Sequence, residues 1–326
     1  MSMGWLKNFA RFDPLQENLL GKIRKTSTDR REYEIEEERL EEQMEIEEEC
    51  NNMIKSVELF EESLSKVVGL DNFKQYFRVL AKGIVFKKIR EGNLGVKNNA
   101  TNIPLLFIGN SGTGKTMAAN VLGKLLYNIG IIDSSEVVEL NPDGKYLTGG
   151  SMYSRPGIVV VNNLQRTIPL GKATEELESV IGNRISFLPC RRILIYTIPN
   201  NLSDKEWNHV AGFFRERMKV IRFSDYTDHE LAQILHAKMK KQDKWSPYKG
   251  YKLHPECSVD AITILLEKDS KVYQRRRLNG LLVDMMLENA CLALEARLSL
   301  NAQGDEVVTI KLEDLEQGLS SIENYP

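Results

Sequence analysis

Apolar residues in the first two-thirds of the chain gather in short continuous runs, as they do in strands that are buried on both faces of a parallel sheet. The runs lie at residues 103–108, 137–140, 157–161, 192–198 and 220–223. Apolar residues at helical spacing follow two of them, at 117–127 and 174–181. Strands that alternate with helices predict an α/β fold with a parallel sheet.

The last third of the chain is mainly helical in pattern. Thr227 and Glu230 form a capping box ahead of a helix at 231–239. Further helices are expected at 258–267, 275–298 and 312–319, with a short strand at 307–310. We therefore expect an N-terminal segment (1–66), an α/β domain (67–225) and a mostly helical domain (226–326).

Residues 28–67 predict one long helix with two different halves. Between Glu32 and Glu49 it carries eleven Glu and one Arg, which indicates a solvated, acidic face. The second half has apolar residues at alternating spacings of four and three: Ile46, Cys50, Met53, Val57, Phe60, Leu64 and Val67. This seam fits either a coiled coil that binds a partner or an amphipathic helix packed on the domain that follows, and the acidic half could engage a protein partner.

Residues 109–116 match the pattern G-x-x-x-x-G-K-[ST] in full, between an apolar run and a helical pattern. Such a glycine-rich turn directs backbone N–H groups at a triphosphate, and the helix N-terminus adds its dipole. Lys115 is expected to reach the β- and γ-phosphates, and the Thr116 hydroxyl to bind Mg²⁺. The expected ATP or ADP contacts are Asn110, Ser111, Gly112, Thr113, Gly114, Lys115, Thr116 and Met117. A chance glycine-rich turn is the competing interpretation, and both flanking segments argue against it.

Composition narrows the function classes further. The net charge of −2 does not indicate a nucleic acid or a membrane surface as partner, and the basic stretch 238–244 is better explained as a solvated helix end. The four cysteines form no C-x-x-C pair, which fits a reducing compartment and disfavours zinc. We find neither a membrane-length apolar run nor a signal-peptide core, and we expect a soluble cytoplasmic protein.

Several further stretches resemble the AAA+ ATPases, within them the branch of the red-type Rubisco activase and the stage V sporulation protein K. Residues 68–70 and 86–90 look like that branch's adenine-binding segment, and residues 212–226 resemble its arginine-finger stretch. Residues 273–276 resemble the sensor-2 start of a lid helix, and residues 309–315 the C-terminal end of the family. The resemblance covers about residues 60–320.

The resemblance implies roles for particular residues. Gly69 and Leu70 would lie by the adenine, and Thr197 would be the sensor-1 residue. Arg217, with Arg215 second, would reach the γ-phosphate of a neighbouring subunit. Arg276 would contact the nucleotide from the lid, although the adjacent Arg275 and Arg277 make that choice less definite. Tyr146 aligns with the aromatic residue of a central pore loop.

Two features depart from the family pattern. The third strand ends in Asn162 and Asn163, where the family has Asp and Glu. An amide cannot accept the proton of an attacking water, so the rate should fall by roughly 10²–10⁴-fold. Only residues 151–156 separate the pore-loop region from the third strand, where the family has a whole helix. That shortening weakens the case for threading a polypeptide.

The sequence therefore predicts a nucleotide-dependent oligomeric assembly or regulatory factor that binds ATP and Mg²⁺ and hydrolyses slowly or not at all. Its partners would be copies of itself or paralogous AAA+ subunits, in a hexamer-like ring or a smaller oligomer. The alternative is an active protein-remodelling ATPase with a hexameric pore.

Overall fold

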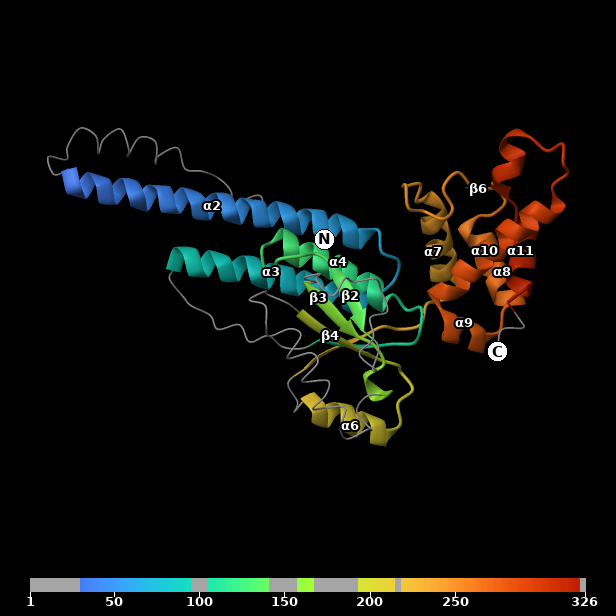
Figure 1. The fold of residues 1–326 in the computed structure, drawn as a ribbon, viewed down its shortest axis with the longest axis horizontal. Helices are drawn as coiled ribbons and strands as arrows, with labels where there is room; N and C mark the ends of the chain where they lie inside the picture. Colours follow the sequence, from blue (N-terminus) through green and yellow to red (C-terminus); the bar gives the residue numbers. More distant parts are fainter. Residues whose placement is uncertain (1–29, 95–104, 141–156, 167–192, 215–217, 323–326) are drawn as a thin grey trace.

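The computed structural model describes residues 30–94, 105–140, 157–166, 193–214 and 218–322 of the 326-residue chain. Figure 1 shows a sheet covered by helices, a separate group of helices beside it, and the long helix α2 (Arg30–Ser65) extending past the sheet. The helix expected at 174–181 lies outside the described residues, as do Tyr146, Arg215 and Arg217.

The sheet has five parallel strands in the order β2-β3-β4-β1-β5, which confirms the predicted α/β class. The strands are β1 (Leu105–Ile108), β2 (Val137–Leu140), β3 (Ile158–Val161), β4 (Ile193–Ile198) and β5 (Lys219–Arg222). In this order β4 lies between β1 and β3, so the carboxyl ends of these three strands meet at one edge. Open parallel sheets bind ligands in the crevice outside these strand ends.

Both faces of the sheet are covered, which explains why β1 and β3 are apolar throughout. Phe107 packs into the core shared with α3 (Asp71–Leu94) and α4 (Lys115–Asn128). The next residue, Ile108, joins the opposite core, where Val210 of α6 (Asp204–Phe214) is also fully buried. Successive side chains of a strand point to opposite faces, so only a continuous apolar run suits such a strand.

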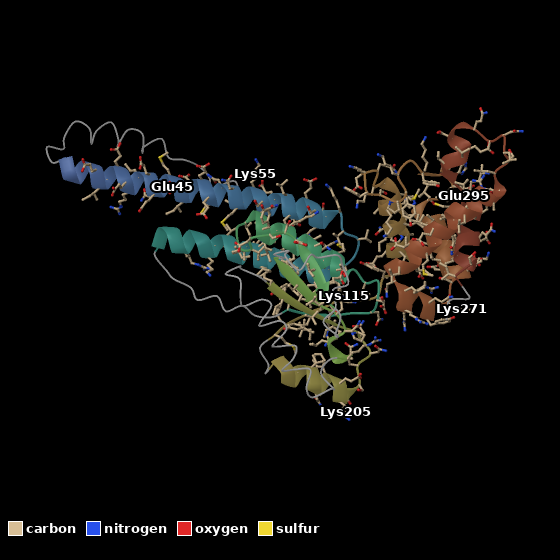
Figure 2. All side chains as sticks on the ribbon, viewed as in Figure 1. Glu45, Lys55, Lys115, Lys205, Lys271 and Glu295 are labelled. Carbon is tan, nitrogen blue, oxygen red and sulfur yellow. The ribbon has the colours of Figure 1, made fainter. Side chains whose placement is uncertain are left out.

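The second half of α2 packs against α3 and α4 of its own domain (Figure 1). Met53, Val57, Phe60 and Leu64 of the predicted seam are all buried in that core. Of the two alternatives for the seam, the structure supports an amphipathic helix laid on the domain. The acidic half is largely exposed, and Figure 2 shows Glu45 on the part of α2 that extends past the sheet.

The C-terminal part forms its own core of helices. They are α7 (Asp228–Lys240), α8 (Val259–Asp269), α9 (Val272–Leu278), α10 (Gly280–Arg297) and α11 (Leu312–Ser320). The predicted capping box is present: Glu230 N donates to Thr227 Oγ1 at 3.2 Å, and Thr227 N donates to Glu230 Oε2 at 2.8 Å. We refer to residues 226–322 as the lid.

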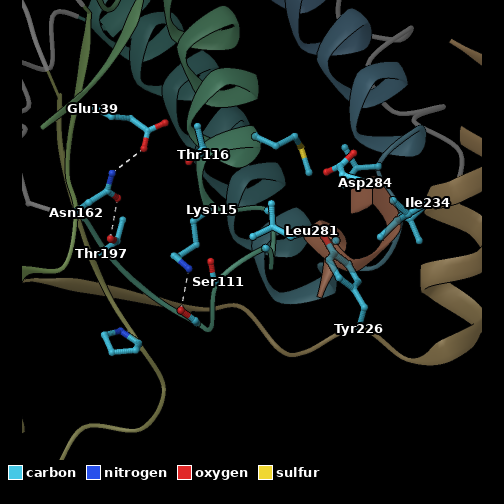
Figure 3. A pocket seen from close by; sticks show the side chains of 18 of the residues that line it. Ser111, Lys115, Thr116, Glu139, Asn162, Thr197, Tyr226, Ile234, Leu281 and Asp284 are labelled. Atoms are coloured by element: carbon cyan, nitrogen blue, oxygen red, sulfur yellow. Dashed lines mark hydrogen bonds between the residues drawn. The ribbon is translucent and has the colours of Figure 1, made fainter. Parts of the chain in front are cut away.

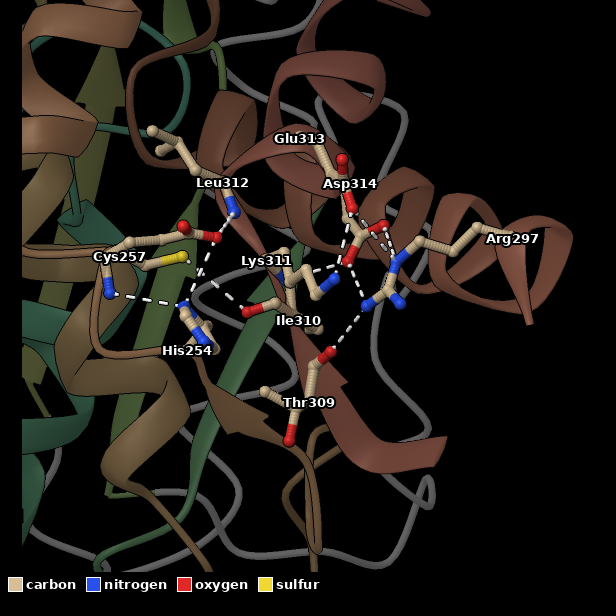
Figure 4. Close-up of polar contacts among 10 residues, drawn as sticks. His254, Cys257, Arg297, Thr309, Ile310, Lys311, Leu312, Glu313 and Asp314 are labelled. Carbon is tan, nitrogen blue, oxygen red and sulfur yellow. Dashed lines mark hydrogen bonds and ion pairs between the residues drawn. The ribbon is translucent and has the colours of Figure 1, made fainter. Parts of the chain in front are cut away.

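A short parallel pair, β6 (Lys252–Leu253) with β7 (Thr309–Ile310), ties the end of the lid to its middle. Beside it, Arg297 Nε donates to Asp314 Oδ1 at 2.6 Å and Arg297 Nη2 donates to Thr309 O at 2.9 Å (Figure 4). Asp314 is only 2% exposed, so the arginine compensates a buried carboxylate. The pair fixes α10 against α11.

Two predicted elements of the lid need correction. The single helix expected at 275–298 is two helices, because Asn279 takes φ +48° and ψ −125° and breaks the helix between α9 and α10. The strand expected at 307–310 is shorter, since residues 307 and 308 belong to the 3₁₀ turn Gly304–Val308. Among the described residues, no helix combines the length and apolarity needed to cross a bilayer.

Candidate functional site

A pocket of about 1020 Å³ lies where the carboxyl ends of the strands face the lid. Figure 3 shows the glycine-rich loop and Lys115 on one side of it, Glu139 and Asn162 on the sheet side, and Tyr226, Ile234 and Leu281 on the lid side. The volume is at the upper end of what small-molecule sites usually have. The pocket therefore occupies the crevice that the strand order predicts.

The glycine-rich loop is shaped to hold an anion. Gly112 and Gly114 adopt φ +71° and +88°, a conformation that glycine takes without strain. A Cβ at Gly112 would overlap Leu278 O, so the loop also needs glycine to let the lid approach. No side chain caps the N-terminus of α4, so its first N–H groups remain available for a phosphate.

Lys115 is folded onto the loop that precedes it. Its Nζ donates to Gly109 O at 2.8 Å and to Asn110 O at 2.6 Å. Burial lowers the pKa of Lys115 to about 8, while the negative charges of Asp225 and Glu139 oppose that shift. The negative charge of a triphosphate would stabilise this partly desolvated ammonium.

The sheet wall is a hydrogen-bonded chain of three side chains. Thr197 Oγ1 donates to Asn162 Oδ1 at 3.0 Å, and Asn162 Nδ2 donates to Glu139 Oε2 at 2.6 Å. Both polar atoms of the Asn162 amide are therefore engaged. Asn163 follows in a left-handed conformation, with φ +53°, and its N–H donates to Thr197 Oγ1 at 3.3 Å.

The donor set at this wall suits Mg²⁺. Thr116, Glu139 and Gln165 all line the pocket and carry side-chain oxygen atoms, and Gln165 Oε1 is buried without a hydrogen-bond partner among the described residues. Mg²⁺ prefers oxygen ligands and keeps several waters, using one or two carboxylates together with substrate phosphates. Within the described ranges, no group of three His, Cys, Asp or Glu could hold a metal on its own. A metal here would depend on bound nucleotide.

Apolar residues also line the pocket, namely Val67, Val68, Ile234 and Ala237, together with Tyr226 and the charged Lys66, Lys238 and Lys241. The apolar residues could pack on the faces of a base. The predicted contacts Gly69 and Leu70 do not line the pocket. They take φ +59° and +58°, which turns Gly69 toward Glu230 and Tyr226 and Leu70 into the core.

The structure brings most of the predicted phosphate and catalytic positions together. The predicted residues that line the pocket are Ser111, Gly112, Gly114, Lys115, Thr116, Met117, Asn162, Asn163 and Thr197. Asn110 and Thr113 instead stabilise the loop: Asn110 Nδ2 donates to Asp225 Oδ1 at 2.9 Å, and Thr113 Oγ1 donates to Asn110 O at 2.8 Å. Their backbone groups shape the cradle that the other residues form.

The predicted lid arginine is not among the lining residues. Arg276 is exposed, whereas Arg275 is tied inside the lid by a 2.6 Å ion pair with Asp228. The lid reaches the glycine-rich loop through the start of α10, where Gly280 N donates to Gly112 O at 3.1 Å and Leu281 lines the pocket. Leu281 therefore lines the pocket from the lid, and Arg276 does not.

Sequence reasoning missed Glu139, although a signal was present. It is the one charged residue in a strand whose flanking residues Val138 and Leu140 are buried. Alternation along a strand places such a residue on the other side from its neighbours. The pairing of β2 with β3 then sets it beside Asn162.

Known proteins resemble this chain over most of its length. Stage V sporulation protein K of Bacillus subtilis (strain 168) is 22% identical over 274 residues, which cover 78% of this chain and 81% of that protein. Protein CfxQ of Xanthobacter flavus is 25% identical over 210 residues, covering 59% and 62% of the two chains. The chain is related to the AAA+ ATPases.

Two further matches refine this assignment. The chloroplastic ribulose bisphosphate carboxylase/oxygenase activase of Cyanidioschyzon merolae (strain NIES-3377 / 10D) is 22% identical over 209 residues, 59% of this chain and 67% of that protein. A family model described as "Domain of unknown function (DUF8495)" matches residues 225–323. These relatives therefore match most of the chain, whereas the family model matches only the lid.

Proposed function

We propose that this AAA+ protein binds Mg²⁺ and ATP, hydrolyses the nucleotide slowly or not at all, and acts as a nucleotide-dependent oligomeric assembly or regulatory factor. The observation that carries the proposal is the carboxyl end of β3. Asn162 has both amide groups engaged, with Glu139 and Thr197, and Asn163 follows it without a carboxylate. The end of this strand is where related ATPases prepare the attacking water.

Nucleotide binding depends little on the residues at the carboxyl end of β3. The loop N–H groups, the N-terminus of α4 and Lys115 supply the attraction for the phosphates. Bound Mg²⁺ would neutralise phosphate charge, held by the Thr116 hydroxyl on the protein side. Nucleotide affinity should therefore persist without a carboxylate at Asn162.

Turnover depends on a group that accepts a proton. A neutral amide such as that of Asn163 has no basic lone pair at neutral pH, and the loss of a general base lowers rates by roughly 10²–10⁴-fold. Thr197 already donates its hydroxyl to Asn162 and is only 3% exposed. The predicted finger Arg217 would stabilise charge but could not replace the base.

Assembly with other subunits is the second part of the proposal. Oligomers are expected from the AAA+ relationship, either of this chain alone or with paralogous subunits that hydrolyse ATP. The exposed acidic half of α2 offers a surface for a protein partner of basic character. Nucleotide would then act as a structural ligand or a slow switch.

An active remodelling ATPase is the second candidate function. The relative named ribulose bisphosphate carboxylase/oxygenase activase favours it. This function requires hydrolysis, a closed ring and Tyr146 at a central pore. It differs from the first proposal in the rate of ATP hydrolysis, so a measurement of that rate distinguishes the two.

The test measures nucleotide binding and turnover on the same purified protein. We expect mant-ATP to bind, and Lys115→Ala to abolish binding. Lys124→Ala is the matched control, because Lys124 lies exposed on the same helix α4 and does not line the pocket. Turnover in the range of working AAA+ enzymes, abolished by Lys115→Ala, would replace the first proposal by the second. Mass photometry with ATP and with ADP reports the oligomer.

A further inference from the structure

We propose that Glu139, on β2, supplies the carboxylate that holds a water ligand of nucleotide-bound Mg²⁺, one strand away from the position that the AAA+ relatives use. The inference rests on the proposed function, because it needs a bound nucleotide. It concerns how this chain keeps metal binding although β3 ends in two asparagines.

Glu139 lies on the strand next to the one that leads into Asn162. β2 and β3 are parallel neighbours, and Leu140 O accepts a 2.9 Å hydrogen bond from Asn162 N at the end of the pair. Glu139 is half-buried and lines the pocket that also contains Thr116. Figure 3 shows the Glu139 side chain pointing from the sheet toward Thr116, with Asn162 beneath it. The carboxylate thus faces the side of the pocket where the metal-binding hydroxyl lies.

The hydrogen bonds of the Asn162 amide fix its orientation. Thr197 Oγ1 accepts from Asn163 N, and the Thr197 hydroxyl donates to Asn162 Oδ1. The amide must then present its NH₂ to Glu139, which accepts at 2.6 Å. An aspartate at 162 would place two carboxylates in contact, and like charges at that distance disfavour each other strongly. The Asn162 amide, unlike an aspartate, can donate a hydrogen bond to the Glu139 carboxylate.

Few acidic residues in the described part of the chain line the pocket. Of the described residues that line the pocket, Glu139 and Asp284 carry carboxylates. Asp284 belongs to the lid and forms a 2.6 Å ion pair with Lys238. Glu139 also acts on Lys115, whose pKa its charge raises against the effect of burial. Its carboxylate is therefore close enough to influence the end of the pocket where the phosphates would bind.

The test compares mant-ATP affinity with Mg²⁺ and with EDTA in the full-length protein. Glu139→Gln keeps an oxygen that can accept from Asn162 but removes the charge. Loss of a carboxylate that orients a metal ligand typically costs 10–100-fold in metal affinity. We expect Glu139→Gln to lose at least tenfold of the affinity gained from Mg²⁺. Binding in EDTA should be unchanged or tighter, because a negative charge near the triphosphate is gone.

Glu136→Gln is the matched control, since Glu136 precedes β2, is exposed and does not line the pocket. Thermal unfolding of both variants shows whether each remains folded. An equal loss of affinity with and without Mg²⁺ would mean that Glu139 only supports the loop, and it would overturn the inference. An unchanged Mg²⁺ effect in a folded Glu139→Gln variant would overturn it as well. If the unmodified protein binds no mant-ATP in either buffer, the proposed function fails instead.

Discussion

Asn279 Nδ2 donates a hydrogen bond to Asp225 Oδ1 at 3.0 Å, and the same carboxylate oxygen accepts from Asn110 of the glycine-rich loop at 2.9 Å. Asn279 is completely buried, and its Oδ1 accepts from Tyr226 N at 2.9 Å. One asparagine at the break between α9 and α10 thus joins the lid to the glycine-rich loop. The lid and the loop share the same Asp225 carboxylate oxygen as hydrogen-bond acceptor.

Gly112→Ala should disrupt this junction. Gly112 and Gly130 share φ +71°, but a Cβ at Gly112 overlaps Leu278 O whereas a Cβ at Gly130 meets open space. Left-handed backbone costs about 1–2 kcal/mol per non-glycine residue, so both variants should lose that stability. Only Gly112→Ala should also lower mant-ATP affinity, by at least tenfold. Equal affinities in the two folded variants would show that the approach of the lid does not matter for binding.

Asn163 should tolerate glycine better than glutamate. Its φ of +53° suits Asn and Gly, while longer side chains are strained there. We expect Asn163→Gly to stay within about 0.5 kcal/mol of the unmodified protein in urea unfolding, and Asn163→Glu to lose about 1 kcal/mol. Restoring the family's glutamate would then carry a cost in stability. A glutamate variant as stable as the glycine one would contradict this backbone argument.

Leu64→Ala should destabilise the sheet domain strongly. Leu64 of α2 is fully buried against the core, so its truncation should lower the free energy of unfolding by about 2–5 kcal/mol. Leu59 lies on the same helix but is 52% exposed, and Leu59→Ala should change the free energy of unfolding by less than about 0.5 kcal/mol. Similar losses in both variants would mean that α2 does not pack as described.

Cys257 should be inert in the folded lid. The thiol is 1% exposed, and burial raises its pKa to about 12. At pH 8 only about one thiol in ten thousand would be ionised, and the thiolate is the reactive form. After treatment with iodoacetamide, mass spectrometry should find Cys257 modified only when denaturant has been added. The modified peptide is assigned by its absence from the Cys257→Ser variant. Rapid native modification would indicate that the lid opens readily.

Local pattern was sufficient for the strands and the glycine-rich loop. A strand buried on both faces has to be apolar throughout, and a loop that wraps a phosphate needs glycine at set positions, so residues 105–116 could be interpreted without neighbours. The break at Asn279 could not, because the surrounding pattern is helical and the positive φ is fixed by hydrogen bonds to Asp225 and Tyr226.

Other features depended on which elements meet in space. The arginines at 275–277 look equivalent in sequence, and Asp228 determines that Arg275 is the one held inside the lid. The seam of α2 could bind a partner or its own domain, and nothing in the seam itself distinguishes them. The position of Glu139 beside Asn162 depends on the register of β2 against β3. The roles expected of Arg217, Arg276 and Tyr146 remain predictions.

The fate of bound ATP tests the central claim most directly. A molar excess of protein is mixed with radiolabelled ATP and Mg²⁺, and the nucleotide recovered from the complex is separated after seconds, minutes and hours. We predict that most of the label remains ATP for hours, with binding lost in Lys115→Ala. Conversion to ADP within seconds, lost in Lys115→Ala and retained in Lys124→Ala, would show that this site hydrolyses ATP efficiently and would contradict the account.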